Sequence, residues 1–154
     1  MNPNPQAAQN YLRMRVMTAT PEQLQMMLYD GAVRFAEQAK AALLERNYEK
    51  SYTAISRVQK ILTELSCTLK HDVHPELCGK LASLYSFAYR KLIEANVRHT
   101  VESVDEALNV LRFQRETWAL LLEQLGKTKA AAVATRMDMP APSARMEASI
   151  SMHG

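Results

Sequence analysis

The chain has 154 residues, of which 47% are apolar, so it is long enough for one domain with its own core. Its four glycines and six prolines are too few for the turns of an all-β fold. Its net charge of +3 comes from its ends, because residues 1–20 and 126–154 each carry +2 and the residues between them carry −1. A groove for nucleic acid would need a clustered basic excess, and no apolar run approaches the ~20 residues that span a bilayer, so we expect neither nucleic-acid binding nor membrane insertion.

The first helical pattern begins at Thr20 and continues to about residue 45. Thr20 can cap the helix, Pro21 suits its first position and Gln23 completes a capping box. Gly31 lies on the apolar seam of this helix, where a glycine costs about 1 kcal/mol relative to alanine. We therefore expect Gly31 to permit the close approach of a neighbouring helix or to make room for a bulky side chain such as Trp118; a direct ligand contact is the alternative.

Three more helical patterns follow along the chain. The second begins after a possible cap at Asn47, and the third opens at Pro75. The fourth has a capping residue at Thr100 or Ser103 and is expected to end at Gly126. Since the helices have similar lengths and short connections, the pattern predicts an all-α fold, an antiparallel up-down four-helix bundle.

The predicted helices divide the chain into three parts. Residues 20–126 form the helical bundle domain. Residues 1–19 precede it as an N-terminal lid segment and lack the basic-then-apolar order of a secretory signal, so we expect a cytoplasmic protein. Residues 127–154 lose the helical periodicity and gain Ala, Ser and Pro, so we expect a disordered C-terminal tail.

Further apolar side chains lie away from the core seam of these helices on a helical wheel. They are Met26, Tyr29 and Val33 on the first helix, Phe87 and Ile93 on the third, and Val110, Phe113 and Leu120 on the fourth. Stripes that repeat at i, i+3 and i+7 favour a contact surface for a partner protein. Three other interpretations stay open: an irregular bundle could bury the stripes, residues 11–17 could fold back over one of them, or the surface could serve self-association in a homodimer.

Four residues at the turn between the second and third helices are candidate metal ligands: Cys67, His71, His74 and Cys78. Cysteine and histidine suit tetrahedral zinc, and Cys67 and His71 share a helix face. Zinc sites usually have more closely spaced cysteines, so a metal-binding helical bundle is the alternative hypothesis. The sequence contains no Glu-x-x-His pair, phosphate loop or nucleophile signature, so we expect neither an enzyme nor a cofactor.

Several stretches of the chain form a recognisable series of motifs. Tyr11 precedes VMTATPEQL (16–24) and MLYDGAV (27–33), and these are followed by YEKSYTAISRVQKILTELSCTL (48–69), LASLYSFAYRKLIEAN (81–96) and VLRFQRETW (110–118). In these motifs the chain resembles the flagellin-specific flagellar export chaperones, the flagellar secretion chaperone FliS family. The family commonly has a glycine-containing turn where this chain has KHDVHPELCG, so this turn departs from the family pattern.

The resemblance implies a helical bundle that binds the C-terminal segment of flagellin in the cytoplasm, prevents its premature polymerisation, keeps it competent for flagellar type III export and delivers it to an export-gate component. Tyr11 matches the family's N-terminal tyrosine, which implies a role at the edge of the client site, with Leu12 and Val16 beside it in the lid. Tyr29 and Asp30 match the family motif and either contact the client or brace the N-terminal segment; we expect Tyr29 to face away from the core.

Overall fold

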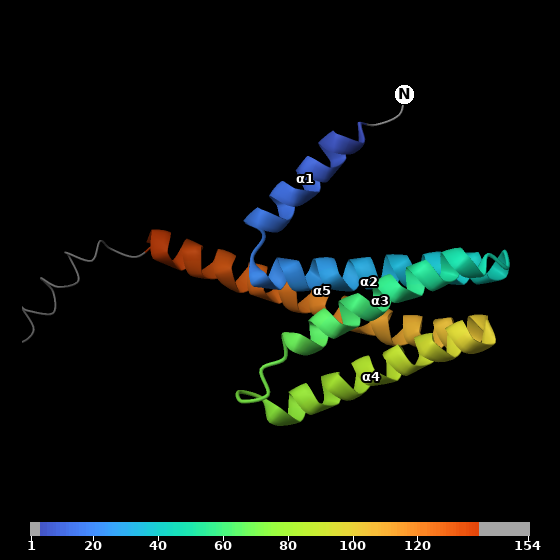
Figure 1. Cartoon of the computed structure of the whole chain (residues 1–154). Coiled ribbons are helices and arrows are strands. Elements are labelled where there is room, and N and C mark those ends of the chain that lie inside the picture. The colour runs from blue at the N-terminus through green and yellow to red at the C-terminus, as the bar shows by residue number, and fades with distance from the viewer. Residues whose placement is uncertain (1–3, 139–154) are drawn as a thin grey trace, which may run out of the picture. The chain divides into compact units, whose positions relative to one another are not determined.

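The computed structural model describes residues 4–138, which form five helices and no strand. The helices are α1 (Pro5–Thr18), α2 (Pro21–Leu44), α3 (Tyr48–Cys67), α4 (Pro75–Arg98) and α5 (Val101–Asp138) (Figure 1). The all-α class is therefore confirmed, with one helix more than the four expected. Among the described residues, those up to Ala119 form one compact unit and those from Leu120 form a second. Within residues 4–138, every helix is too short or too polar to span a bilayer.

The additional helix is α1, in the segment where the sequence predicts only a lid. The side chain of Asn4 caps it by accepting a hydrogen bond from the backbone N–H of Gln6 at 3.1 Å, and Pro5 occupies its first position. None of its residues is buried. The sequence of this segment has no amphipathic pattern, because apolar residues recur at helical spacing only where one face of a helix is buried, and α1 buries no face.

The expected starts of α2, α3 and α5 are confirmed by their caps. The backbone N–H of Gln23 donates to Thr20 Oγ1 at 3.2 Å, and the N–H of Thr20 donates to Gln23 Oε1 at 3.0 Å, which completes the capping box. Asn47 caps α3 through its side chain. At the start of α5, Thr100 Oγ1 accepts from the N–H of Ser103 at 3.3 Å, so Thr100 and not Ser103 is the cap.

The expected end of the last helix at Gly126 is wrong, because α5 continues to Asp138. Gly126 lies inside the helix, and a Cβ added there would meet nothing within 4 Å. A glycine costs a helix about 1 kcal/mol but does not end it, and the alanine-rich residues 130–134 that follow favour helix. The rest of the expected tail, residues 139–154, lies outside the described residues.

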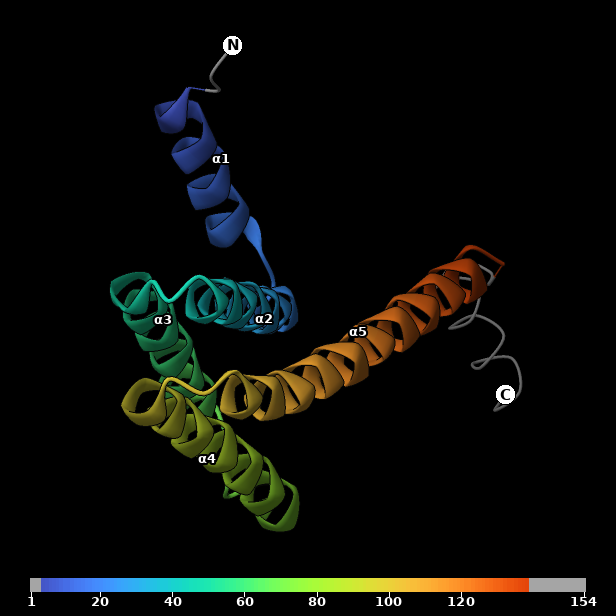
Figure 2. The same ribbon diagram turned by 90° about the vertical axis from the view of Figure 1, so that its right-hand side faces the viewer.

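Helices α2, α3, α4 and the first part of α5 enclose one hydrophobic core. These four helices run in alternating directions along the chain (Figure 1), and α3 lies beside both α2 and α4 (Figure 2). The larger of their fully buried apolar side chains come from all four: Val33, Ile55, Val58, Leu62, Leu65, Tyr85, Leu92, Val104, Leu108 and Leu111. The core therefore depends on every one of these helices.

Gly31 permits close packing between α2 and α3. It is buried, and a Cβ added to it would lie 3.3 Å from Ile61 Cδ1 on α3, a tighter approach than most side chains accept. Of the expected roles of Gly31, the close approach of a neighbouring helix is therefore confirmed.

Candidate binding site

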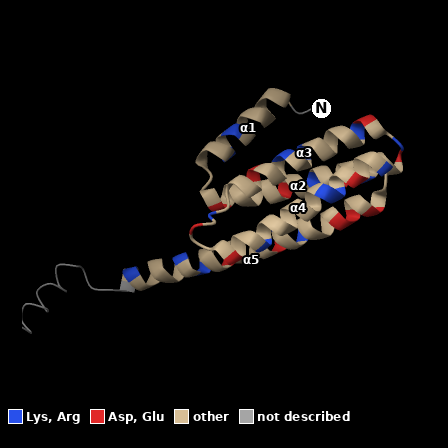
Figure 3. Cartoon of the chain, turned by 60° about the horizontal axis from the view of Figure 1, so that its bottom comes forward, with Lys and Arg blue, Asp and Glu red and all other residues tan. Residues whose placement is uncertain are grey.

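The apolar stripe expected to be exposed on α2 is largely buried, which corrects the prediction from the sequence. Tyr29 is 2% exposed and Val33 is 1% exposed, while Met26 is half-buried. The reason is that α2 has neighbours on several sides, so that most of its circumference is covered. Besides α3, it contacts α5 through two ion pairs, Lys40–Asp105 at 2.8 Å and Glu37–Arg112 at 3.2 Å (the charged residues are coloured in Figure 3).

Tyr29 belongs to a buried aromatic group that joins three helices. Its hydroxyl oxygen lies 2.6 Å from that of Tyr85 on α4, and its ring centroid lies 6.3 Å from that of Trp118 on α5, with the rings tilted by 55°. Trp118 Nε1 donates to the carbonyl oxygen of Glu22 at 2.9 Å. Burial, reinforced by the hydrogen bond to Tyr29, raises the pKa of Tyr85 above its usual range. Tyr29 therefore faces the core, contrary to expectation.

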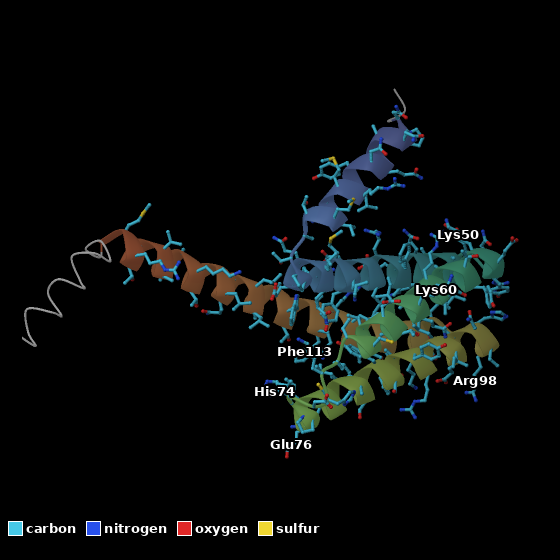
Figure 4. The ribbon with its side chains drawn as sticks, turned by 60° about the vertical axis from the view of Figure 1, so that its left-hand side comes forward. Lys50, Lys60, His74, Glu76, Arg98 and Phe113 are labelled. Carbon is cyan, nitrogen blue, oxygen red and sulfur yellow. The ribbon has the colours of Figure 1, made fainter. Side chains whose placement is uncertain are left out.

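The other residues expected to bind a partner lie on four helices and differ in exposure. Seven are exposed: Tyr11, Leu12 and Val16 on α1, Asp30 on α2, Ile93 on α4, and Phe113 and Leu120 on α5. Phe87 and Val110 are half-buried, and Val110 packs against the core. Phe113, the aromatic residue of the α5 stripe, is 63% exposed; its side chain is labelled in Figure 4. On α5, Phe113 and Leu120 of the expected stripe are thus exposed, whereas Val110 is not.

An apolar pocket lies beside Trp118, between the beginning of α2, the α3–α4 connection and the beginning of α4. It has a volume of about 440 Å³ and is called the Trp118 pocket below. Its apolar walls are Leu69, Leu77, Leu81 and Trp118. Leu77 is 55% exposed although it has the spacing of a core residue, so periodicity alone assigns it to the core and misses the pocket.

A second pocket, of about 420 Å³, lies between α3 and α4 and is called the α3–α4 pocket below. Its lining combines apolar and aromatic side chains with five hydroxyls, two of them on tyrosines, and one guanidinium: Leu62, Thr63, Ser66, Cys67, Tyr85, Ser86, Tyr89 and Arg90. Tyr85 takes part in both this pocket and the buried tyrosine pair, which therefore lies behind it. None of the twelve residues expected to bind a partner lines either pocket.

The four candidate metal ligands do not come together. Cys67 is exposed and Cys78 is buried, and no group of three or more His, Cys, Asp or Glu side chains in residues 4–138 is placed to hold a metal ion. The two histidines lie in or beside the α3–α4 connection, and His74 precedes α4 without a side-chain capping bond. The geometry gives the metal-binding alternative no support.

Comparisons with protein families, with curated sequences and with solved structures all match this chain to FliS or to a flagellar chaperone. The family described as "Flagellar protein FliS" matches residues 4–125. The flagellar secretion chaperone FliS of Bacillus subtilis is 29% identical over 126 residues, which are 82% of this chain and 92% of that protein. The namesake from Escherichia coli is 30% identical over 104 residues, 67% of this chain and 76% of that one. A solved structure described as "Crystal structure of flagellar chaperone from bacteria" has a TM-score of 0.63 at 21% identity and covers 79% of this chain and 99% of its own.

Proposed function

This chain belongs to the FliS family of flagellar secretion chaperones, and we propose that it binds the C-terminal segment of flagellin in the cytoplasm. Its scaffold is an antiparallel up-down bundle of α2 to α5. The chaperone prevents premature polymerisation of flagellin and keeps it competent for type III export, and it delivers the client to an export-gate component.

The observation that carries this proposal is the apolar Trp118 pocket. A chaperone of an assembling subunit has to mask apolar side chains that otherwise bind the next subunit, and it needs apolar surface of its own to do so. The Trp118 pocket supplies three leucines and a tryptophan at the surface. The hydrogen bond from Trp118 to Glu22 and its contact with Tyr29 fix the indole in place before a client arrives, which lowers the entropy cost of binding.

The Trp118 pocket therefore replaces the stripes as the leading client site. Tyr29 and Val33 are almost completely buried and have very little surface to offer a client. Phe113 and Ile93 are exposed and are candidates for additional contacts. A client segment ordered on this surface loses conformational entropy on binding, which offsets part of the gain from apolar burial.

The lid interpretation of residues 1–19 becomes part of the same proposal. Tyr11, Leu12 and Val16 on α1 are exposed and apolar, and α1 joins the chain directly before Pro21, which also lines the Trp118 pocket. Such a segment competes with the client for apolar surface. Deleting residues 1–17 is then expected to tighten client binding, and an unchanged or weaker affinity would contradict the lid.

Calorimetric titration with the C-terminal segment of the same organism's flagellin tests the function. We expect saturable one-to-one binding with a negative heat-capacity change, because apolar surface is buried. Leu77→Asp should weaken it by about 30-fold, the loss expected at an interface hot spot. Val97→Asp is the matched control, since Val97 is an exposed aliphatic residue on the same helix outside both pockets.

Two outcomes would contradict the proposal in different ways. If neither the whole chain nor the chain without residues 1–17 binds the segment, flagellin is not the client. If binding occurs but Leu77→Asp and Val97→Asp weaken it equally, the client lies elsewhere than in the Trp118 pocket.

Self-association is the second candidate, because Phe113 and Ile93 leave exposed apolar surface on the helices that enclose the core. Light scattering at several concentrations distinguishes it. A homodimer requires a mass that rises towards two chains, and the mass of one chain at every concentration would exclude it.

A further inference from the structure

Helix α5 continues beyond the part of the chain that the family accounts for. The family match ends at residue 125, and α5 runs on to Asp138. The residues from Leu120 belong to a compact unit of their own, and every side chain described between Glu123 and Met137 is exposed. The proposed client site in the Trp118 pocket therefore does not use the surface of residues 120–137, which are called the helical extension below.

One side of the extension is apolar. Leu122, Gly126, Ala130, Val133 and Met137 fall within about 80° of one another at 100° per residue. Val133 is 51% exposed and Met137 is 81% exposed, so this side is open to a partner.

The charges of the extension are basic and border this side. By the same angles, Lys129 and Arg136 lie within about 40° of one edge of the apolar stripe and Lys127 lies about 60° beyond the other, while no acidic residue occurs between Gln124 and Met137. Glu123 forms a 3.3 Å pair with Lys127 that is largely exposed and therefore weak. The extension thus combines an exposed apolar stripe with three cations, two of them in no ion pair among the described residues.

We propose that residues 120–137 bind an anionic lipid surface, with the helix lying in the plane of the interface. An interfacial helix places apolar side chains among the acyl chains and lysine or arginine at the level of the phosphates. The long stems of Lys129 and Arg136 allow their charges to reach the headgroups while the stripe is buried. Single-stranded nucleic acid fits less well, since the segment has no aromatic side chain on which a base could stack.

The binding is expected to be peripheral, reversible and dependent on salt. Each basic residue near an anionic surface contributes about fivefold to the affinity, so the three together contribute on the order of 100-fold. Raising the ionic strength screens that contribution and should weaken the binding.

Sedimentation with lipid vesicles tests this proposal on the full chain. One set of vesicles contains phosphatidylcholine mixed with phosphatidylglycerol, and the other contains phosphatidylcholine alone. The test variant carries Lys127→Gln, Lys129→Gln and Arg136→Gln. The matched control carries Lys50→Gln, Lys60→Gln and Lys80→Gln, which remove the same charge at exposed positions of α3 and α4 (Lys50 and Lys60 are labelled in Figure 4).

The proposal expects the whole chain and the control variant to sediment with the anionic vesicles, and the test variant to lose on the order of 100-fold in affinity. Met137→Asp should also weaken the binding if the apolar stripe enters the interface. Equal binding to both vesicle types, an equal loss in the control, or competition by a single-stranded RNA that removes the chain from vesicles would each overturn it. Because no flagellin is present, the result is independent of the proposed client function.

Discussion

The apolar stripes that lie away from the core seam on α2 and α5 have similar spacing in the sequence but differ in solvent exposure in the structure. Tyr29 and Val33 on α2 are almost completely buried, whereas Phe113 on α5 is 63% exposed. The difference comes from the number of neighbours. Helix α2 meets α3 at Gly31, α4 through the tyrosine pair and α5 through ion pairs, so it has little free circumference.

The comparison shows what a helical wheel measures. The wheel gives the angle between side chains on one helix, but exposure depends on how many other helices surround it. An off-seam apolar residue on a helix with several neighbours is a core residue, and the same residue on the outer side of a helix is available to a partner.

The largest difference is expected from introducing a charge into each stripe. Tyr29→Asp buries an uncompensated carboxylate in the core and breaks the bond to Tyr85, so it should lower the free energy of unfolding by about 3–5 kcal/mol. Phe113→Asp places the same charge in water and should change it by less than about 0.5 kcal/mol. Urea denaturation followed by circular dichroism measures both. Similar effects of the two substitutions would refute the assignment of buried and exposed stripes.

A smaller effect is expected when only the polar contact of the buried stripe is removed. Tyr85→Phe leaves the hydroxyl of Tyr29 with only the 3.4 Å contact to Gln25 and should cost about 1–3 kcal/mol. The pH dependence separates this contact from packing.

Above the ordinary tyrosine pKa of about 10, the unfolded chain loses a proton that folded Tyr85 retains, because burial raises the pKa of Tyr85. The free energy of unfolding should therefore fall as the pH rises above about 10, by at most about 1.4 kcal/mol per unit from this group. Tyr85→Phe should flatten this slope. An identical slope in the variant would show that other groups cause it.

The smallest expected difference concerns the two helix-interior glycines. Gly126→Ala should stabilise its helix by up to about 1 kcal/mol, because the added Cβ meets nothing. Gly31→Ala brings the same gain in helix propensity, but the 3.3 Å approach to Ile61 opposes it, so its gain should be smaller. Hydrogen exchange of the flanking amides measures each helix locally. In an Ile61→Val background the gain at Gly31 should increase, and no change there would exclude the steric account.

Much of the fold was predictable from the sequence where local chemistry and core packing agree. The capping box at Thr20, the cap at Asn47 and Pro75 mark helix starts that the structure confirms. Helix α1 was missed because a helix that buries no face has no required periodicity. The helix end predicted at Gly126 is wrong because a glycine ends a helix only where its backbone leaves the helical conformation. Gly126 stays within α5.

The candidate site was less predictable than the fold. The Trp118 pocket is formed by residues from α2, the α3–α4 connection, α4 and α5, and no spacing within one helix indicates that they meet. Trp118 and Leu77 both have core spacing, and only the packing of several helices leaves one side of each open. Long-range convergence of this kind is a tertiary property that periodicity does not contain.

The capping box at the start of α2 also bears on how freely the beginning of the chain can vary. Thr20 and Gln23 satisfy one another's backbone N–H groups, so α2 begins at Pro21 whatever precedes it. Changes before residue 20 therefore do not alter which residues of α2 face the core. Residues 1–19 are therefore expected to tolerate shortening, lengthening or proteolytic cleavage without loss of the core, so that the proposed lid can change separately from stability.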